Sequence, residues 1–380
     1  MLTGEATRLT PVSDMITKPK PNTSSKASAQ VPETKHKRIL LGLDVHADLI
    51  VVVRILDNSA PQPAQQFTRA QFVEWARKQL EKAEEVHSCY EAGPFGYGLH
   101  RKLEAMGVHN LVVQPVCLDE RHTGVNNDKT DARALAMRLD RYVSGNTKAL
   151  ATVRIPSEAE EQKRAVSRQR DQLKREMRRL ATQGRALMLT QEIREKGDWW
   201  KPKRWEGLKR RLAEWLIEAL EHFRVVIEAL RLEEEGVSAK ILAKESGPRP
   251  KGLGPMTLET VDREVGNWDR FKNRRQVGSY TGLVGGVSSS GNSRRTLSIT
   301  KHGNARLRTA LVEAAWRMVM HQPESRLVKK WAGVLGNPRA TKGARKKAVV
   351  GMARQLAVDL WRWRTGRVKP EDLSWEMMAG

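Results

Sequence analysis

Four carboxylates in the first third of the chain lie where they could bind a metal ion together. Asp44 follows the apolar run ILLGL and Glu91 follows VHSCY, so each lies in or at the end of an expected β-strand. Asp128 and Asp131 are three residues apart at the start of an expected helix, which places them on one helix face. Mg²⁺ prefers oxygen ligands, and paired ions can clamp the attacking and leaving oxygens of a phosphodiester. We therefore predict a Mg²⁺ site at these residues and chemistry on nucleic acid.

These acids also have a structural interpretation. A single Asp is most often a surface residue or a helix cap, and Asp128 could cap the helix that carries Asp131. Three further acids are candidates for the same site: Asp48, Asp119 and Glu120. Asp48 falls in an expected hairpin turn and the other two fall in a loop, so the prediction leaves them out.

The charge of the chain favours a nucleic-acid partner. Its 68 Lys and Arg residues exceed its 44 Asp and Glu residues, so the net charge is +24 and the pI is about 10.3. A chain this basic repels itself unless a polyanion neutralises it. A packaging protein that uses charge alone would share this composition. However, 380 residues leave room for two or three domains with cores of their own.

The cysteine count and the apolar runs indicate the compartment. With only Cys89 and Cys117, a disulfide framework or a cysteine zinc site is not expected, and a reducing cytosol fits. No stretch approaches 18 consecutive apolar residues, and the N-terminus has no apolar signal core. We expect a cytoplasmic protein without a membrane partner.

Composition and periodicity divide the chain into four regions. Residues 1–35 are rich in Ser, Thr, Pro and Lys, which predicts a disordered basic extension. Residues 36–150 predict an α/β domain with the order three strands, helix, strand, helix, strand, helix. Residues 151–240 read as charged helix, and residues 241–380 as a mostly α-helical domain.

The helical middle carries a seven-residue repeat. Its apolar members are Val166, Leu173, Leu180 and Leu187. We expect a helical hairpin or a short coiled coil, with a second helix over residues 205–232 and a turn near 195–203. The repeat fits two alternatives: apolar residues that pack inside one chain, and an interface through which two chains associate.

The C-terminal region contains two segments that could bind phosphate. Lys251 opens KGLGP, where small residues could let backbone amides approach a phosphate, as in helix-hairpin-helix elements. A Gly/Ser-rich stretch around Ser290 is usually just a flexible loop. Here Arg294, Arg295 and Lys301 follow it, and these cations could hold a phosphate that a serine oxygen attacks.

Together these motifs resemble the DEDD, RuvC-like insertion-sequence transposases that work as bridge-RNA-guided serine recombinases. The resemblance runs from about Ile39 to Met320. It rests on the four acids, on Asp-x-x-Asp-Ala at 128–132, on Gly-Leu-Gly-Pro, and on Ile-Thr-Lys-x-Gly-Asn at 299–304. Two features depart from the family pattern. Gly285 stands where the family commonly has proline, and Ser288 and Ser289 crowd the nucleophile position.

The resemblance implies an RNase H-like catalytic domain, a coiled-coil assembly region and a C-terminal transposase domain that supplies the nucleophile. Counting from Gly282-Leu283 places that nucleophile at Ser290. The implied reaction is cleavage and exchange of DNA strands through a serine–DNA link with Mg²⁺ assistance. The implied partners are donor DNA, target DNA and a bridge RNA. Because serine and acids lie far apart in sequence, we expect a homodimer or homotetramer with a composite active site.

Two other classes of protein fit the same residues. A metal-dependent nuclease of the junction-resolving type would need only the acids and would form no protein–DNA ester. A non-enzymatic nucleic-acid-binding protein would use only the charge. Trapping of a covalent DNA adduct separates the transposase from the nuclease.

Overall fold

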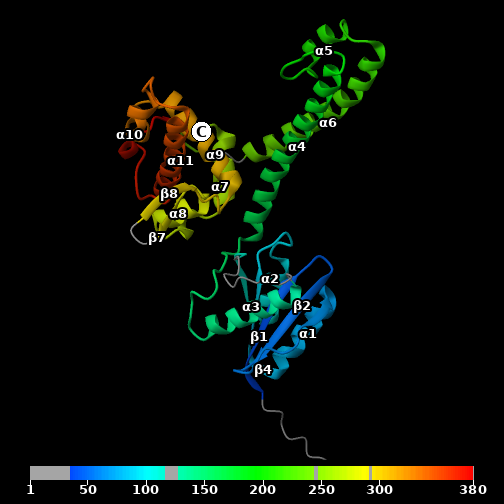
Figure 1. Cartoon of the computed structure of the whole chain (residues 1–380), viewed down its shortest axis with the longest axis vertical. Helices are drawn as coiled ribbons and strands as arrows, with labels where there is room; N and C mark the ends of the chain where they lie inside the picture. The colour runs from blue at the N-terminus through cyan, green and yellow to red at the C-terminus, as the bar shows by residue number, and fades with distance from the viewer. Residues whose placement is uncertain (1–34, 116–126, 244–246, 291–292, 380) are drawn as a thin grey trace, which may run out of the picture. The chain divides into compact units, whose positions relative to one another are not determined.

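The computed structural model describes residues 35–115, 127–243, 247–290 and 293–379, without the side chains of Ser290, Arg294 and Thr296. Most of the expected N-terminal extension, together with Asp119 and Glu120, therefore lies outside the described residues. The chain forms two compact units, Met1–Ile155 and Pro156–Gly380 (Figure 1).

The first unit is a five-stranded sheet with helices on both faces. Its elements are β1 (His36–Val45), β2 (Leu49–Leu56), β3 (Gln65–Thr68), α1 (Arg69–Lys82), β4 (Ala83–Glu91), α2 (Gly98–Met106), β5 (His109–Val113) and α3 (Asp128–Val143). The strand order is β3-β2-β1-β4-β5, with β1 antiparallel to β2 and parallel to β4. The element order is the one predicted from sequence.

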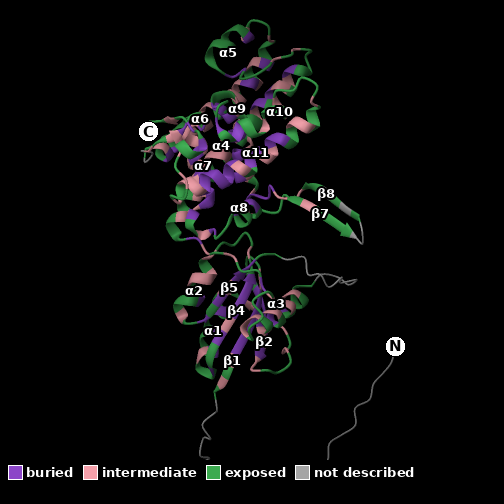
Figure 2. Ribbon diagram, turned by 90° about the vertical axis from the view of Figure 1, so that its left-hand side faces the viewer, coloured by how far each residue is buried: buried purple, intermediate pink, exposed green. Residues whose placement is uncertain are grey.

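Alternate residues of the central strand β1 face two separate cores. Ile39, Leu41 and Leu43 pack with Phe72 of α1 and Leu103 of α2. Leu40 faces the other way and packs with α3. Burial on both faces explains the nearly continuous apolar run of β1, and Figure 2 shows these strands as buried.

The second unit is mostly helical. Its elements are α4 (Glu158–Leu189), α5 (Pro202–Lys209), α6 (Glu214–Leu242), β6 (Arg249–Pro250), α7 (Pro255–Val265), η1 (Trp268–Arg270), α8 (Arg274–Thr281), β7 (Gly285–Ser290), β8 (Ser293–Ile299), α9 (Ala305–His321), α10 (Arg326–Leu335), α11 (Lys342–Arg364), η2 (Glu371–Leu373) and β9 (Met377–Met378). The predicted helical middle and C-terminal region lie in this one unit, since α4 and α6 both pack on α7.

Helices α4 and α6 pair into a long arm, as the seven-residue repeat predicts (Figure 1). The second predicted helix, over residues 205–232, is wrong in extent. It is two helices, because the chain turns at residues 210–213 between α5 and α6, and α6 continues to Leu242. Trp199 and Trp205 fold α5 onto the arm in a local core, where Trp199 donates a hydrogen bond to the Ala181 carbonyl at 2.9 Å.

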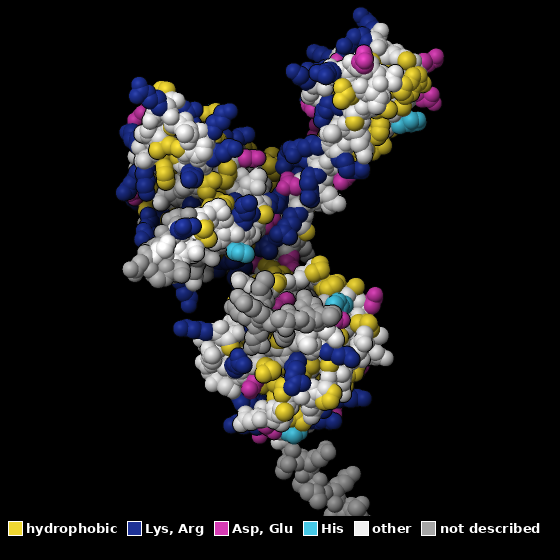
Figure 3. All heavy atoms as spheres, in the orientation of Figure 1, with side chains coloured by type: hydrophobic (Ala, Val, Ile, Leu, Met, Phe, Trp, Pro, Cys, Tyr) yellow, Lys and Arg dark blue, Asp and Glu magenta, His cyan; other side chains and the backbone are white. Residues whose placement is uncertain are grey.

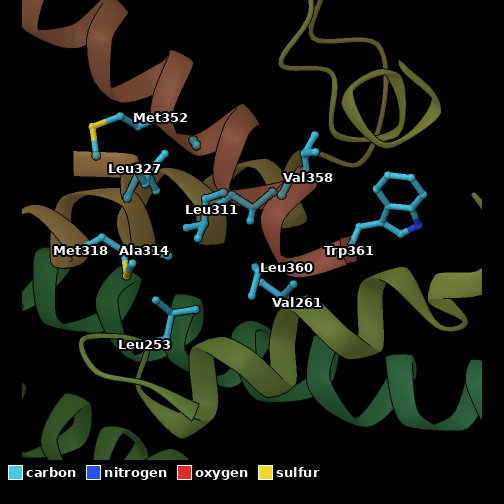
Figure 4. Close-up of a cluster of buried hydrophobic side chains, with 14 of the residues drawn as sticks. Leu253, Val261, Leu311, Ala314, Met318, Leu327, Met352, Val358, Leu360 and Trp361 are labelled. Carbon is cyan, nitrogen blue, oxygen red and sulfur yellow. The ribbon is translucent and has the colours of Figure 1, made fainter. Parts of the chain in front are cut away.

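The C-terminal helices share one large apolar core. Figure 4 shows Leu311 and Met318 of α9 meeting Met352 and Leu360 of α11. All four side chains are fully buried. This core fixes the positions of the segments that carry the candidate nucleophile.

The Gly/Ser-rich stretch is not the loop that the sequence suggests. It forms the antiparallel hairpin β7–β8, with Ser288 opposite Arg295 and Ser290 opposite Ser293. Val287 and the run Thr296–Ile299 supply β-branched and large apolar residues that favour a strand. Within the described residues, no helix has the length and apolar character needed to cross a bilayer.

Candidate active site

Asp44 lies near the end of β1, on the face covered by α3. Gly42 precedes it on the same face, and a Cβ atom there would lie 2.2 Å from the Ala132 carbonyl oxygen of α3. Only glycine allows this approach, so α3 lies directly on β1. The first turn of α3 is thereby brought beside Asp44.

Glu91 occupies the corresponding position on the neighbouring strand. In the parallel pair of β1 and β4, Leu43 is the partner of Tyr90, so Asp44 and Glu91 are the next residues on each strand. Residues in register on parallel strands face the same side of the sheet. Cys89, two residues before Glu91, packs in the α3 core, which places Glu91 on that face as well.

The paired aspartates stand in the first turn of α3. Asn127 is the N-cap, and its side chain accepts a hydrogen bond from the Lys129 amide at 3.1 Å. Asn127 and not Asp128 therefore caps α3, so the side chain of Asp128 is available to the candidate metal site. Both Asp128 and Asp131 also interact favourably with the positive end of the helix dipole.

His46 joins this site, and the sequence analysis missed it. Its Nε2 atom lies 3.2 Å from Asp44 Oδ2 and 3.4 Å from Asp128 Oδ2. The possible ligand atoms of the three residues all lie within 4.8 Å of one another. The signal was the spacing Asp-x-His at a strand end, which can place both side chains at one site.

Arg69 holds the turn that carries His46. Its guanidinium donates hydrogen bonds to the carbonyl oxygens of His46 and Ala47, each at 2.8 Å. The same guanidinium lies over the Phe95 ring, 5.0 Å from its centroid. These hydrogen bonds hold the backbone of the turn from which the His46 imidazole extends.

The electrostatics of Asp44 reflect this crowding. Burial raises the pKa of Asp44, contact with His46 opposes the rise, and the negative charges of Asp128 and Asp131 raise it again. Asp131 is thus close enough to repel Asp44. A cation among these groups would relieve the repulsion.

The β7–β8 hairpin presents the candidate serines. Ser288 and Ser289 are exposed, and Arg295, the strand partner of Ser288, is exposed too. Directly opposed residues of an antiparallel pair lie on one face, so Arg295 shares a face with Ser288. Lys301 lies just beyond β8 with a left-handed backbone, φ 58°.

The root of this hairpin is held by a buried carboxylate. Glu264 of α7 is fully buried, accepts a hydrogen bond from Asn304 at 2.6 Å, and pairs with Arg306 at 2.9 Å and Arg168 at 3.0 Å. Tyr280 donates its hydroxyl to the Glu264 carbonyl oxygen at 2.7 Å. Asn304 ends the Ile-Thr-Lys-x-Gly-Asn motif, so this motif residue has a structural role.

Arg308 fastens the same root from α9. Its guanidinium donates to the carbonyl oxygens of Thr281 and Lys301, at 3.1 and 3.2 Å. Gly303, with φ 138°, has the Tyr280 carbonyl oxygen 2.5 Å from where a Cβ would stand. The chain segments before and after the hairpin therefore cross at backbone distance.

The Gly-Leu-Gly-Pro turn serves packing. A Cβ at Gly252, where φ is 88°, would lie 3.0 Å from His321 Cβ and 3.2 Å from the Arg317 carbonyl oxygen. The Leu253 amide donates to Pro250, and Lys251 forms an ion pair with Glu376 at 2.6 Å. Of the predicted phosphate-binding cations, Lys251 is thus already paired.

Known proteins support a relation to transposases. Residues 249–330 match the family described as Transposase IS116/IS110/IS902 family. A putative transposase y4rJ of Sinorhizobium fredii is 29% identical over 300 residues, 72% of this chain and 75% of the relative. A second, y4qE, is 33% identical over 245 residues, 62% and 59% of the two chains.

A third relative extends the similarity over most of the chain. The transposase for insertion sequence element IS1111A of Coxiella burnetii is 25% identical over 346 residues, 85% of this chain and 88% of its own. The chain is therefore similar to transposases over most of its length, and its residues 249–330 match the IS116/IS110/IS902 family.

Proposed function

We propose that this protein is a metal-dependent DNA transposase of the DEDD, RuvC-like class, with an RNase H-like first unit. The observation that carries the proposal is the cluster of Asp44, His46 and Asp128 at the end of β1. Asp131 lies near enough to act electrostatically on Asp44, and Glu91 is next to Asp44 by strand register but is not part of the cluster. The match of residues 249–330 to a transposase family supports it independently.

The residues present fit a divalent metal. They offer oxygen donors from two strands and one helix. The pKa of Asp44 is raised first by burial and further by the negative charges of Asp128 and Asp131, which a bound cation would offset. Asp44, Glu91, Asp128 and Asp131 would hold Mg²⁺, with the His46 imidazole beside them. A bound Mg²⁺ supplies charge stabilisation at the phosphate oxygens.

Ser290 supplies the nucleophile in this proposal. Its hydroxyl oxygen attacks the phosphorus of a DNA strand, a new oxygen–phosphorus bond forms, and the bond to the leaving deoxyribose oxygen breaks. The serine proton passes to that leaving oxygen. Arg295 and Lys301, with Arg294 beside them in sequence, would pair with the phosphate. Lys251 would join them only by giving up its pair with Glu376.

Donor DNA, target DNA and a bridge RNA are the proposed partners. Base pairing to the RNA would select sequence, and protein contacts would read backbone and shape. The proposal also includes a homodimer or homotetramer, because α6 carries large apolar side chains that are exposed. These are Trp215, Val225, Val226 and Leu232, each about half or more exposed. Val225 and Leu232 are seven residues apart, which suits a helix partner.

Covalent trapping tests the reaction. The protein, Mg²⁺, bridge RNA and DNA carrying the element ends are incubated and denatured, and the peptide that retains DNA is identified by mass spectrometry. We expect the adduct on Ser290, none with Ser290→Ala, and milder losses with Ser288→Ala or Ser289→Ala. An adduct on Ser288 or Ser289 would move the nucleophile. Strand cleavage without any adduct would favour the junction-resolving nuclease.

A further inference from the structure

One segment of the second unit is positively charged without any acid. Between residues 325 and 358 the sequence has no Asp or Glu. It has nine cations: Arg326, Lys329, Lys330, Arg339, Lys342, Arg345, Lys346, Lys347 and Arg354. Less than a tenth of the chain thus carries a charge of +9, against +24 for the whole.

Four of these cations lie close together in the chain at one corner, formed by the connection 336–341 and the first two turns of α11. We call it the basic corner. Its exposed cations are Arg339, Lys342, Lys346 and Lys347. Figure 3 shows Lys and Arg side chains over much of the surface in the region where Figure 1 places α10 and α11.

Within the described residues, Arg339, Lys342, Lys346 and Lys347 form no ion pair. The cations of α10 differ, because Lys329 pairs with Glu324 at 2.8 Å, and Arg326 and Lys330 oppose the rise in the pKa of the buried Asp359. Arg345 is folded back, with its guanidinium donating to the Asn337 carbonyl oxygen at 2.9 Å. It braces the connection between the two helices.

The placement of these cations costs stability. The first turn of α11 has no acid and contains Lys342, and the next turn adds Lys346 and Lys347. A cation in the first turn, such as Lys342, lies at the positive end of the helix dipole and destabilises the helix. The helix persists because its later turns are buried, including Val349 and Met352. Such a corner is stabilised when a polyanion binds it.

We propose that the basic corner binds the phosphate backbone of duplex DNA. It is distinct from the hairpin cations, and α11 lies outside the residues 249–330 matched to the transposase family. The choice of DNA rests on the proposed function, which makes DNA the substrate. Because such contacts are to backbone phosphates, they add affinity and register but no sequence preference.

Salt dependence of binding tests this proposal. The parent is the full chain with Ser290→Ala, so that no covalent step enters the measurement. The test variant adds Lys342→Gln, Lys346→Gln and Lys347→Gln. The matched control instead adds Arg179→Gln, Lys201→Gln and Lys209→Gln, which remove the same charge from cations already paired with an acid three residues earlier.

We expect the test variant to bind a DNA duplex several-fold more weakly. The slope of log K against log salt should fall by roughly 0.9 for each lost phosphate contact. The control should match the parent. In the absence of DNA the test variant should melt at the parent temperature or slightly above it, because the removed cations oppose the helix dipole. With Ser290 restored, the test variant should need a higher DNA concentration than the natural protein to reach half of its maximal adduct yield.

Three outcomes would overturn the proposal. An unchanged slope in the test variant would show that the corner does not contact DNA. Equal losses in test and control would show a general charge effect. A loss confined to an RNA duplex of the same length would assign the corner to RNA. A parent that binds no DNA would refute the proposed function as well, whereas the first three outcomes leave it standing.

Discussion

At the residue scale, the site is a cluster whose charges oppose folding. Asp44 has a raised pKa because of its burial and the nearby negative charges of Asp128 and Asp131. We expect Asp44→Asn or Asp128→Asn to lower strand cleavage by about 10²–10³-fold. Either change should slightly raise the melting temperature in metal-free buffer, because repulsion is relieved. A strand-cleavage assay and thermal unfolding measure the two effects.

Asp48→Asn is the matched control for these variants. Asp48 is exposed in the turn after His46 and belongs to no cluster of ligand atoms among the described residues. The Asp48→Asn protein should cleave DNA strands at the same rate as the natural protein. Full cleavage activity of Asp44→Asn would mean that Asp44 takes no part in the reaction.

Gly42 is the residue on which the geometry of the metal site depends. Gly42→Ala would place a methyl group 2.2 Å from the Ala132 carbonyl oxygen and 2.3 Å from the Ala136 amide nitrogen. We expect a loss of about 1–3 kcal/mol or more in the free energy of unfolding, and weaker Mn²⁺ binding as α3 moves away. Urea unfolding and calorimetry measure these changes. Gly98→Ala, where a Cβ would meet nothing within 4 Å, should be neutral or stabilising.

At the element scale, Glu264 joins α4, α7, α8 and α9 at the root of the hairpin. Burial raises the pKa of Glu264, but bonds from Arg168, Asn304 and Arg306 outweigh this and leave it lowered. Glu264→Gln removes a buried charge from its partners, which costs about 3–5 kcal/mol. We expect faster hydrogen exchange of the Thr300 and Lys301 amides, which bond to Val284 and Gly282.

Glu259→Gln on the same helix separates this effect from general weakening of α7. Its partner Arg263 also donates hydrogen bonds to the carbonyl oxygens of Lys163 and Ile241, so Arg263 keeps partners when Glu259 is changed. For Glu259→Gln, the free energy of unfolding in urea and the hydrogen-exchange rates of the Thr300 and Lys301 amides, followed by mass spectrometry, should therefore change little. Equal exchange at the hairpin root in both variants would argue against the role of Glu264.

Helix α11 contains a carboxylate whose burial opposes folding at neutral pH. Burial raises the pKa of Asp359, and the hydrogen bond from Gln355 only partly offsets this. A raised pKa means that the folded state holds the proton more tightly, so stability falls as pH rises from the unfolded pKa through the folded one. Asp359→Asn should melt a few degrees higher at pH 7, with the gain vanishing at acidic pH.

Thermal melts across pH measure this difference. Asp269→Asn, at an exposed carboxylate, should show no comparable gain. A gain for Asp359→Asn that is equal at every pH would mean that packing, and not ionisation, explains it.

At the scale of the whole molecule, the acids and the serine belong to different units, Met1–Ile155 and Pro156–Gly380. If the active site is shared between subunits, a mixture of Ser290→Ala and Asp44→Asn proteins should regain part of the adduct yield. The serine of one subunit then works with the intact acids of the other. Refolding the two variants together and measuring adduct yield checks this. No recovery would place serine and acids of one subunit in the same site.

The sequence by itself determined the element order of the first unit and the positions of the four acids. Strand alternation and helix periodicity are local, so Asp44 and Glu91 could be assigned to strand ends and Asp128 and Asp131 to a helix start. The seven-residue repeat likewise predicted the pairing of α4 with α6. Whether these acids bind Mg²⁺ and whether Ser290 is the nucleophile stay predictions.

Tertiary structure decided the features that depend on contacts between distant segments. Gly42 matters only because α3 crosses it, and His46 joins the acids only because Arg69 anchors its turn. The Gly/Ser-rich stretch pairs as a hairpin whose root is held by Glu264 and Arg308, on helices α7 and α9. Local propensity contains no information about such partners, which is why a loop was expected where two strands form.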